Sequence, residues 1–331
     1  MTAKPPTRVM ITPPMLVEYP AALAPLRDAG CEVVVNTGAY PMSADQLAAC
    51  LKGATAAVVG LDDLAASVFA ACPELRLVAR NGVGLDNVDL DAANQHGVLI
   101  TAPFGANSTS VAELAMGLLI ALVRQVIPTH NRVQAGVWQR VPGMELAGKT
   151  LGIIGLGRIG KKVARRAQAF NMRVIANDIY PDLYFAREHT IPMLGFETVL
   201  AESDIISLHV PLTPLTYHML NRTTLTQMKQ GAYLLNTARG AVLDGLALAE
   251  ALDSGHLAGA ALDVHPVEGV VEAALLNRPN VLTTTHLGAY THDALQYTTE
   301  VAVQSILQYL NGQRPSGLVN PEVWDRRYAD R

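Results

Sequence analysis

The segment Leu151–Gly160, with the sequence LGIIGLGRIG, constrains the fold more than any other part of the chain. It begins with an apolar run typical of a buried strand, followed by Gly155, Gly157 and Gly160 at the spacing GxGxxG. A helical pattern and a second apolar strand, Arg173–Asn177, come next. This strand–turn–helix–strand order predicts the first part of a dinucleotide-binding α/β domain.

The residues of this turn also indicate which ligand it accepts. Glycines let the backbone approach a pyrophosphate, and the first amides of the next helix lie unpaired at its positive end. Asp178 follows the second strand, about 18 positions after Gly160, where it can accept hydrogen bonds from both ribose hydroxyls. Because a 2′-phosphate would meet a like charge there, the sequence predicts NAD rather than NADP.

Composition narrows the class of protein further. A length of 331 residues predicts about two domains, and 50% hydrophobic with only 16% charged residues is enough for large buried cores. The net charge is −4, and the basic residues within Lys161–Arg166 are expected on a solvated helix face, so we expect no nucleic-acid partner. Cys31, Cys50 and Cys72 lack the spacing of a disulfide framework or zinc site, so no metal is expected.

The sequence gives no indication of export or of a membrane. The first residues, MTAKPPTR, lack the apolar core of a signal peptide. The longest apolar stretch, near Val111–Val123, contains Glu113 and is too short to span a bilayer. We therefore expect a cytoplasmic protein with no membrane partner.

Two α/β patterns follow one another along the chain, which predicts mostly parallel sheets. Long helices are expected over Ser108–Val126 and Asp293–Leu310, and the tail after them is too short to fold alone. We predict two Rossmann-like, doubly wound domains separated by a cleft, the smaller one discontinuous and flavodoxin-like. Residues 1–101 with 290–331 would form the substrate-binding domain, and residues 102–289 the NAD-binding domain. The expected strands of the first pattern are Val9–Thr12, Val33–Asn36, Ala56–Val59, Leu75–Ala79 and Val98–Ile100, and the later strands of the second are Ile205–Leu208, Ala232–Leu235, Gly259–Leu262 and Val281–Thr285.

Reactive side chains follow the strands of the second pattern, where open parallel sheets bind ligands. A dehydrogenase of hydroxy acids needs a cation for the carboxylate, an acid–base near neutral pH and a carboxylate that orients it. Arg239, His286 and Glu268 can supply this set. Spacing alone leaves His209 as an alternative to His286, and Asp263 as an alternative to Glu268.

Six segments resemble the D-isomer-specific 2-hydroxyacid dehydrogenase family, which includes 3-phosphoglycerate dehydrogenase, glyoxylate and hydroxypyruvate reductases and D-lactate dehydrogenase. The similarity covers nearly the whole chain after about residue 75. The segments are RNGVGLDNVDL (Arg80–Leu90), ELAGKTLGIIGLGRIG (Glu145–Gly160), SLHVPLTP (Ser207–Pro214), MKQGAYLLNTARGAVLD (Met228–Asp244), AGAALDVHPVEG (Ala258–Gly269) and THLGAYT (Thr285–Thr291).

The resemblance implies a role for each matching residue. Arg239 would bind the substrate carboxylate, His286 would be the acid–base and Glu268 its partner. The substrate-binding residues would be Arg80, Asn81, Gly82, Val83, Gly84 and Arg239. The cofactor-binding residues would be Gly155, Gly157, Arg158, Ile159, Gly160, Asp178, His209, Val210, Pro211, Thr237, Ala238, Arg239, Asp263, His286 and Gly288.

Other positions concern the substrate and a partner chain. Arg80 matches an arginine that phosphoglycerate-type members use against a phosphate; a salt bridge is the alternative. Gly136–Arg140 resembles the family's dimer-contact loop, which implies a homodimer with Trp138 and Arg140 near the interface; otherwise Trp138 covers its own cleft. The sequence leaves open what Phe104, His265, Tyr290 and His292 do, and with it the identity of the substrate.

The function expected from the sequence is the NAD-dependent interconversion of a D-2-hydroxy acid and its 2-oxo acid, mainly as a 2-oxoacid reductase. One alternative is 3-phosphoglycerate dehydrogenase, and another is an NAD dehydrogenase that oxidises phosphite or a phosphonate. Formate dehydrogenases of the family carry glutamine where this chain has Glu268, which argues against that branch. The non-enzymatic alternative is an NAD-sensing, corepressor-like binding protein.

Overall fold

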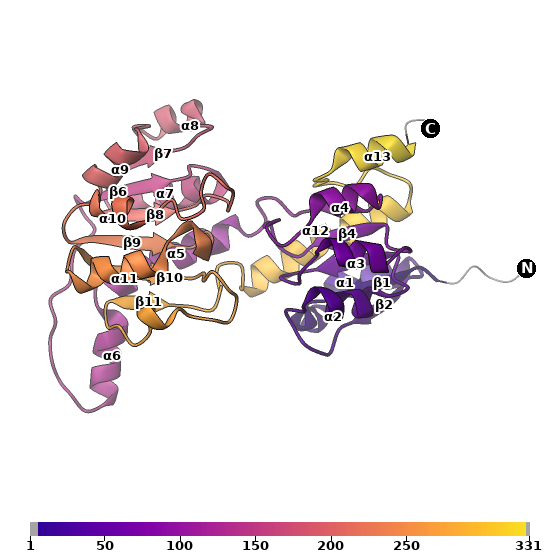
Figure 1. Cartoon of the computed structure of the whole chain (residues 1–331), viewed down its shortest axis with the longest axis horizontal. Coiled ribbons are helices and arrows are strands. Elements are labelled where there is room, and N and C mark those ends of the chain that lie inside the picture. Colours follow the sequence, from indigo (N-terminus) through magenta and orange to yellow (C-terminus); the bar gives the residue numbers. More distant parts are fainter. Residues whose placement is uncertain (1–5, 329–331) are drawn as a thin grey trace, which may run out of the picture. The chain divides into compact units, whose positions relative to one another are not determined.

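The structure, a computed structural model, describes residues 6–328 and consists of two compact units, each built on a parallel sheet (Figure 1). Unit 1 comprises residues up to Asn107 together with those from Thr291 onward, and unit 2 comprises Ser108–Tyr290. The predicted doubly wound α/β class is confirmed. Residues 1–5 and 329–331, which the sequence assigns to the substrate-binding domain, lie outside the described residues.

Unit 1 has a five-stranded sheet in the order β2-β1-β3-β4-β5, with every neighbouring pair parallel. The central strand β3 consists of four apolar residues that are all buried, as expected for a strand covered on both faces. The strands are β1 (Arg8–Ile11), β2 (Glu32–Val35), β3 (Ala56–Val59), β4 (Leu77–Arg80) and β5 (Leu99–Thr101). The helices are η1 (Pro14–Glu18), α1 (Pro20–Asp28), α2 (Ala44–Leu51), α3 (Ala66–Ala71), α4 (Leu90–Gln95), α12 (His292–Leu310) and α13 (Pro321–Tyr328).

The C-terminal part of the chain completes unit 1. Helix α12 contributes Ala302, Val303 and Ile306 to the same core as the strand residues Val9 and Ile11. The tail is also held by the backbone, because the amide of residue 102 donates to the carbonyl of residue 317 at 2.9 Å. Residues 102–107, expected in the other domain, therefore lie in unit 1.

Unit 2 has a six-stranded parallel sheet in the order β11-β10-β9-β8-β6-β7. Its strands are β6 (Thr150–Ile154), β7 (Arg173–Asn177), β8 (Ile205–Leu208), β9 (Ala232–Asn236), β10 (Leu257–Leu262) and β11 (Val281–Thr283). Its helices are α5 (Ser108–Val123), α6 (Val126–Gln134), α7 (Arg158–Ala169), α8 (Leu183–Glu188), α9 (Phe196–Glu202), α10 (Arg222–Thr226), η2 (Gly240–Val242), α11 (Gly245–Asp253) and η3 (Ala273–Leu275). The first strand, β6, lies between β7 and β8, so the chain reverses its direction across the sheet at the glycine turn.

The helix predicted over Ser108–Val126 ends at Val123 instead. Gln125 has a left-handed backbone (φ 54°), which interrupts the helix, and α6 then runs at 61° to α5. Helix α5 is largely buried, whereas α6 buries none of its residues and projects from the sheet of unit 2 (Figure 1). Within residues 6–328, no single helix is long and apolar enough to cross a bilayer, although the bent pair α5–α6 reaches that length and composition.

Candidate active site

The glycine turn between β6 and α7 is shaped for close backbone approach. Gly155 has φ 96°, and a Cβ there would lie 2.7 Å from the backbone oxygen of His209. A Cβ at Gly160 would overlap with the backbone oxygen of Gly155, so the helix packs directly on the turn. Gly157, which precedes the first residue of α7, has no neighbour within 4 Å of such an atom. The backbone is therefore closely packed at Gly155 and Gly160, whereas Gly157, at the N-terminus of α7, leaves space for a ligand.

Asp178 is fixed beside this turn. One carboxylate oxygen accepts a hydrogen bond from the amide of Leu156 at 2.7 Å, and the other accepts from the amide of Tyr180 at 2.8 Å. The acid thus lies where a ribose would follow a pyrophosphate on the turn. After strand β9, the hydroxyl oxygen of Thr237 is buried and has no hydrogen-bond partner within residues 6–328. An open helix N-terminus, a fixed acid and a buried unpaired hydroxyl fit a bound dinucleotide.

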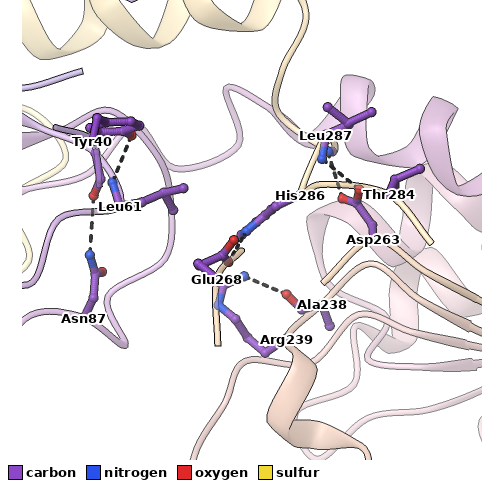
Figure 2. A network of polar contacts seen from close by, with 12 residues as sticks. Tyr40, Leu61, Asn87, Ala238, Arg239, Asp263, Glu268, Thr284, His286 and Leu287 are labelled. Carbon is purple, nitrogen blue, oxygen red and sulfur yellow. Dashed lines mark hydrogen bonds and ion pairs between the residues drawn. The ribbon is translucent and has the colours of Figure 1, made fainter. Parts of the chain in front are cut away.

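The imidazole of His286 contacts the carboxylate of Glu268. The distance from Nδ1 to Oε1 is 2.6 Å, and Figure 2 shows the two side chains pointing toward each other. The hydrogen bond from His286 is the main cause that lowers the pKa of Glu268, and the charges of His286, Arg239 and His265 add to it. Glu268 is therefore ionised at neutral pH and can stabilise a positive charge on the ring.

Arg239 is presented by a turn that a buried asparagine organises. The side-chain amide of Asn236 donates to the backbone oxygen of Arg239 at 2.9 Å, and its oxygen accepts from the amide of Ala238 at 3.0 Å. The guanidinium donates from Nη1 to the backbone oxygen of Ala238 at 2.7 Å (Figure 2). A Cβ at Gly240 would overlap with the backbone of His265, so the loop that carries Glu268 packs directly on this turn.

The carboxylate of Asp263 holds the loop on which His286 lies, and only 1% of this residue is exposed. It accepts from the hydroxyl of Thr284 at 2.6 Å, from the amide of Leu287 at 2.7 Å and from the amide of Gly288 at 2.9 Å. The backbone of His286 is left-handed (φ 57°), a conformation that costs energy in a residue with a side chain. Asp263 stabilises this conformation through the backbone, so Glu268 is the acidic partner of the ring.

His209, the other candidate acid–base, lies in a different environment. Its Nε2 is 2.8 Å from the hydroxyl oxygen of Ser207, and its Nδ1 is buried with no partner in the described part of the chain. Burial lowers the pKa of His209 to about 4. It is therefore neutral at neutral pH, and its ring contacts a hydroxyl, whereas the ring of His286 contacts a carboxylate.

In unit 1, the predicted substrate loop Asn81–Gly84 follows strand β4. Asn81 anchors it, because the backbone amide donates to the oxygen of Val59 at 2.8 Å and the side chain donates to Thr298 of α12 at 3.0 Å. The next three amides, those of residues 82–84, have no hydrogen-bond partner within residues 6–328. Consecutive amides without a partner are available to donate hydrogen bonds to an anion.

Arg80 lies beneath this loop and is 3% exposed. Its Nη2 donates to the side-chain oxygen of Asn87 at 2.8 Å and to the backbone oxygen of Gly84 at 3.3 Å. The guanidinium therefore contacts the loop from inside unit 1.

The sequence did not identify the residues that support the site. Thr284 acts through its hydrogen bond to Asp263. Gly240 acts by leaving space for the backbone of His265. The remaining predicted cofactor residues lie on the same loops: Arg158 and Ile159 open α7, Val210 and Pro211 follow β8, Ala238 lies in the turn after β9, and Gly288 in the loop after β11. The only signal for Gly240 was its position directly after Arg239, and the only signal for Thr284 was its position two residues before His286.

The sequence is similar to known dehydrogenases over most of its length. Residues 116–288 match the model for the NAD-binding domain of D-isomer-specific 2-hydroxyacid dehydrogenases. A glyoxylate reductase of Thermofilum pendens is 37% identical over 305 residues, with 88% of this chain and 89% of that protein covered. A D-3-phosphoglycerate dehydrogenase of Bacillus subtilis is 40% identical over 255 residues, but this covers 76% of the chain and only 49% of that longer protein.

Solved structures agree with the sequence matches. The D-lactate dehydrogenase of Aquifex aeolicus, solved as a complex with NAD and lactic acid, superimposes with a TM-score of 0.82 at 31% identity. The superposition covers 92% of this chain and 96% of that one.

Proposed function

This chain belongs to the D-isomer-specific 2-hydroxyacid dehydrogenase family, and we propose that it works mainly as a 2-oxoacid reductase that forms the D-2-hydroxy acid. It is an NAD-dependent dehydrogenase. The observation that carries the proposed chemistry is the 2.6 Å contact between Nδ1 of His286 and the carboxylate of Glu268, on a loop whose backbone Asp263 holds. When bound, NADH supplies a hydride to C2 of the substrate.

We assign the binding of the substrate carboxylate to Arg239 and to the amides of the loop Asn81–Gly84. A guanidinium is always charged and can form two parallel hydrogen bonds with a carboxylate. It also polarises the neighbouring carbonyl, which favours attack at its carbon. The turn organised by Asn236 supports this assignment, because Asn236 donates to the backbone oxygen of Arg239 and accepts from the amide of the preceding residue, Ala238.

The proton for the new hydroxyl comes from His286 in this proposal. With Nδ1 bound to Glu268, Nε2 is the nitrogen left to face the carbonyl oxygen. The ionised carboxylate of Glu268 stabilises the imidazolium before it donates, and it keeps the ring in one orientation afterwards. In the oxidative direction the neutral ring would accept the proton from the hydroxyl.

We also propose a homodimer in which α6 and the segment after it contact the partner. Trp138 is 83% exposed, and a cavity of about 630 Å³ beside it is lined in part by Val126, Val133 and Arg140. A helix without any buried residue, followed by an exposed tryptophan, is suited to an interface in which aromatic residues contribute much of the binding energy.

The direct test is loss of NADH absorbance with glyoxylate, pyruvate, hydroxypyruvate, phosphohydroxypyruvate and phenylpyruvate, and gain of NADH from NAD with phosphite. Turnover with at least one 2-oxo acid is expected. His286→Ala should lower kcat by about 10²- to 10⁴-fold, the typical contribution of a general acid, and His209→Ala by far less. Equal losses in the two variants, or turnover with phosphite alone, would overturn the proposal.

A further inference from the structure

The loops at the carboxyl ends of the unit 1 strands carry no basic residue. We call residues 12–19, 36–43, 60–65, 81–89 and 102–107 the edge loops, since each lies between a strand and the α-helix that follows it; the first includes η1. They contain five acidic residues, Glu18, Asp62, Asp63, Asp86 and Asp89, and no lysine, arginine or histidine. Ligands of open α/β sheets bind at this edge, so its charge bears on which substrates it accepts.

Arg80, the last residue of β4, lies next to the edge loops, and its guanidinium is turned inward. Its hydrogen bonds to Asn87 and Gly84 stabilise the shape of the loop Asn81–Gly84, which we call the anion-binding loop because its amides are proposed to bind the substrate carboxylate. Asn87 in turn donates to the backbone oxygen of Asp62 at 2.6 Å, so the two edge loops after β3 and β4 are joined through it. To reach a phosphate above the loop, the guanidinium would have to leave these partners and a buried position.

Uncharged side chains flank the anion-binding loop. Leu61 follows β3 and Phe104 follows β5, the strands on either side of β4, and the two residues are 41% and 46% exposed. The hydroxyl of Tyr40 accepts a hydrogen bond from the amide of Leu61 at 3.1 Å (Figure 2), and it lies so close to Gly60 that a Cβ there would overlap with the hydroxyl oxygen. Nδ1 of His292, the first residue of α12, lies 2.8 Å from the hydroxyl oxygen of Tyr19, which is in the first edge loop.

We infer that the substrate is a 2-oxo acid with a short, uncharged group on C2, and that Arg80 positions the anion-binding loop and does not bind a phosphate. The inference rests on the proposed function, since it concerns the group attached to the carbon that is reduced. The loop amides bind the substrate carboxylate, and the side chains of the neighbouring loops, Leu61, Tyr40 and Phe104, are uncharged, which suits hydrogen, methyl or hydroxymethyl on C2. Within unit 1, a phosphate dianion would meet edge loops that contain five acidic residues and no lysine, arginine or histidine.

The first experiment compares kcat/KM for hydroxypyruvate and phosphohydroxypyruvate, which differ by the phosphate alone. We expect at least about 100-fold preference for hydroxypyruvate, because the phosphate of the other acid would lose its hydration without gaining a partner in unit 1. A ratio near one, or a preference for the phosphorylated acid, would overturn the inference while leaving the proposed reductase intact. Absence of turnover with every 2-oxo acid would instead refute the proposed function.

The second experiment separates the two roles of Arg80. Arg80→Met and Asn87→Ala should each raise KM and lower kcat/KM for both acids by the same factor, within about threefold, because both variants loosen the shared carboxylate site. If Arg80 binds phosphate, Arg80→Met would weaken the phosphorylated acid selectively and Asn87→Ala would not.

A surface substitution keeps the test independent of how well Arg80→Met folds. Leu61→Arg places a cation among the edge loops at an exposed position, and Leu61→Gln is its uncharged control of similar length. We expect Leu61→Arg to improve the kcat/KM ratio of phosphohydroxypyruvate to hydroxypyruvate by about 10-fold or more over Leu61→Gln. Equal ratios in the two variants would show that the charge of this edge does not select the substrate.

Discussion

The buried ring of His209 is predicted to make the free energy of unfolding depend on pH, and a substitution can measure this contribution. The perturbation is His209→Asn, which keeps a polar group beside Ser207 and removes the titratable ring. His96→Asn, at an exposed position in unit 1, is the control for loss of a histidine as such.

The expected magnitude follows from the pKa of His209, which burial lowers from 6.5 to about 4. Because one pKa unit corresponds to about 1.4 kcal/mol, this difference amounts to about 3 kcal/mol. The folded state resists protonation at His209, so the unfolded state binds more protons between pH 6.5 and pH 4. The free energy of unfolding therefore falls as the pH is lowered through this window, and His209→Asn should remove that part of the decrease.

Urea denaturation followed by circular dichroism at several pH values between about 4.5 and 7 measures the effect. The loss of stability on acidification should be smaller in His209→Asn than in the wild type by about 2–3 kcal/mol, and unchanged in His96→Asn. Parallel curves for wild type and His209→Asn would refute the conclusion that His209 is held neutral by burial.

Three further substitutions test the supporting parts of the structure. Asp263→Asn replaces an acceptor of the amides of Leu287 and Gly288 with a side chain that is half donor; a cost of about 1–3 kcal/mol in thermal unfolding and a lower kcat are expected. Gly240→Ala places a Cβ against the backbone of His265 and should lower kcat at least about 10-fold through displacement of the Glu268 loop; wild-type turnover in a folded variant would contradict that packing. Trp138→Ala should shift the protein toward monomers in sedimentation velocity, while Tyr184→Ala, also exposed, should not. An unchanged dimer in the Trp138 variant, or a monomer in the wild type, would refute the proposed interface.

The sequence predicted the elements whose pattern is local. Strands such as Ala56–Val59 and Arg173–Asn177 were predicted with their observed bounds, because short apolar runs between turn residues define buried strands. The break after Val123 was not predicted, since the apolar pattern continues through it and only the left-handed backbone of Gln125 ends the helix.

The candidate site was predictable as a set of residues but not as a set of pairs. Strand ends identified His209, His286, Asp263 and Glu268 as reactive side chains at one sheet edge, because parallel strands end together. Which acid contacts which histidine depends on side-chain directions across nonlocal loops. The inward direction of Arg80 likewise depends on Asn87, and no periodicity or spacing specifies such a contact.

The central claim is that His286 and Glu268 act as one unit in proton transfer, and a double-mutant cycle on kcat for 2-oxo acid reduction tests it most directly. His286→Ala and Glu268→Gln should each lower kcat strongly, and the double variant should be no slower than His286→Ala within about threefold, because Glu268 acts through the ring. If the two effects multiply instead, the carboxylate acts independently of the imidazole, and the assignment of this pair would be wrong.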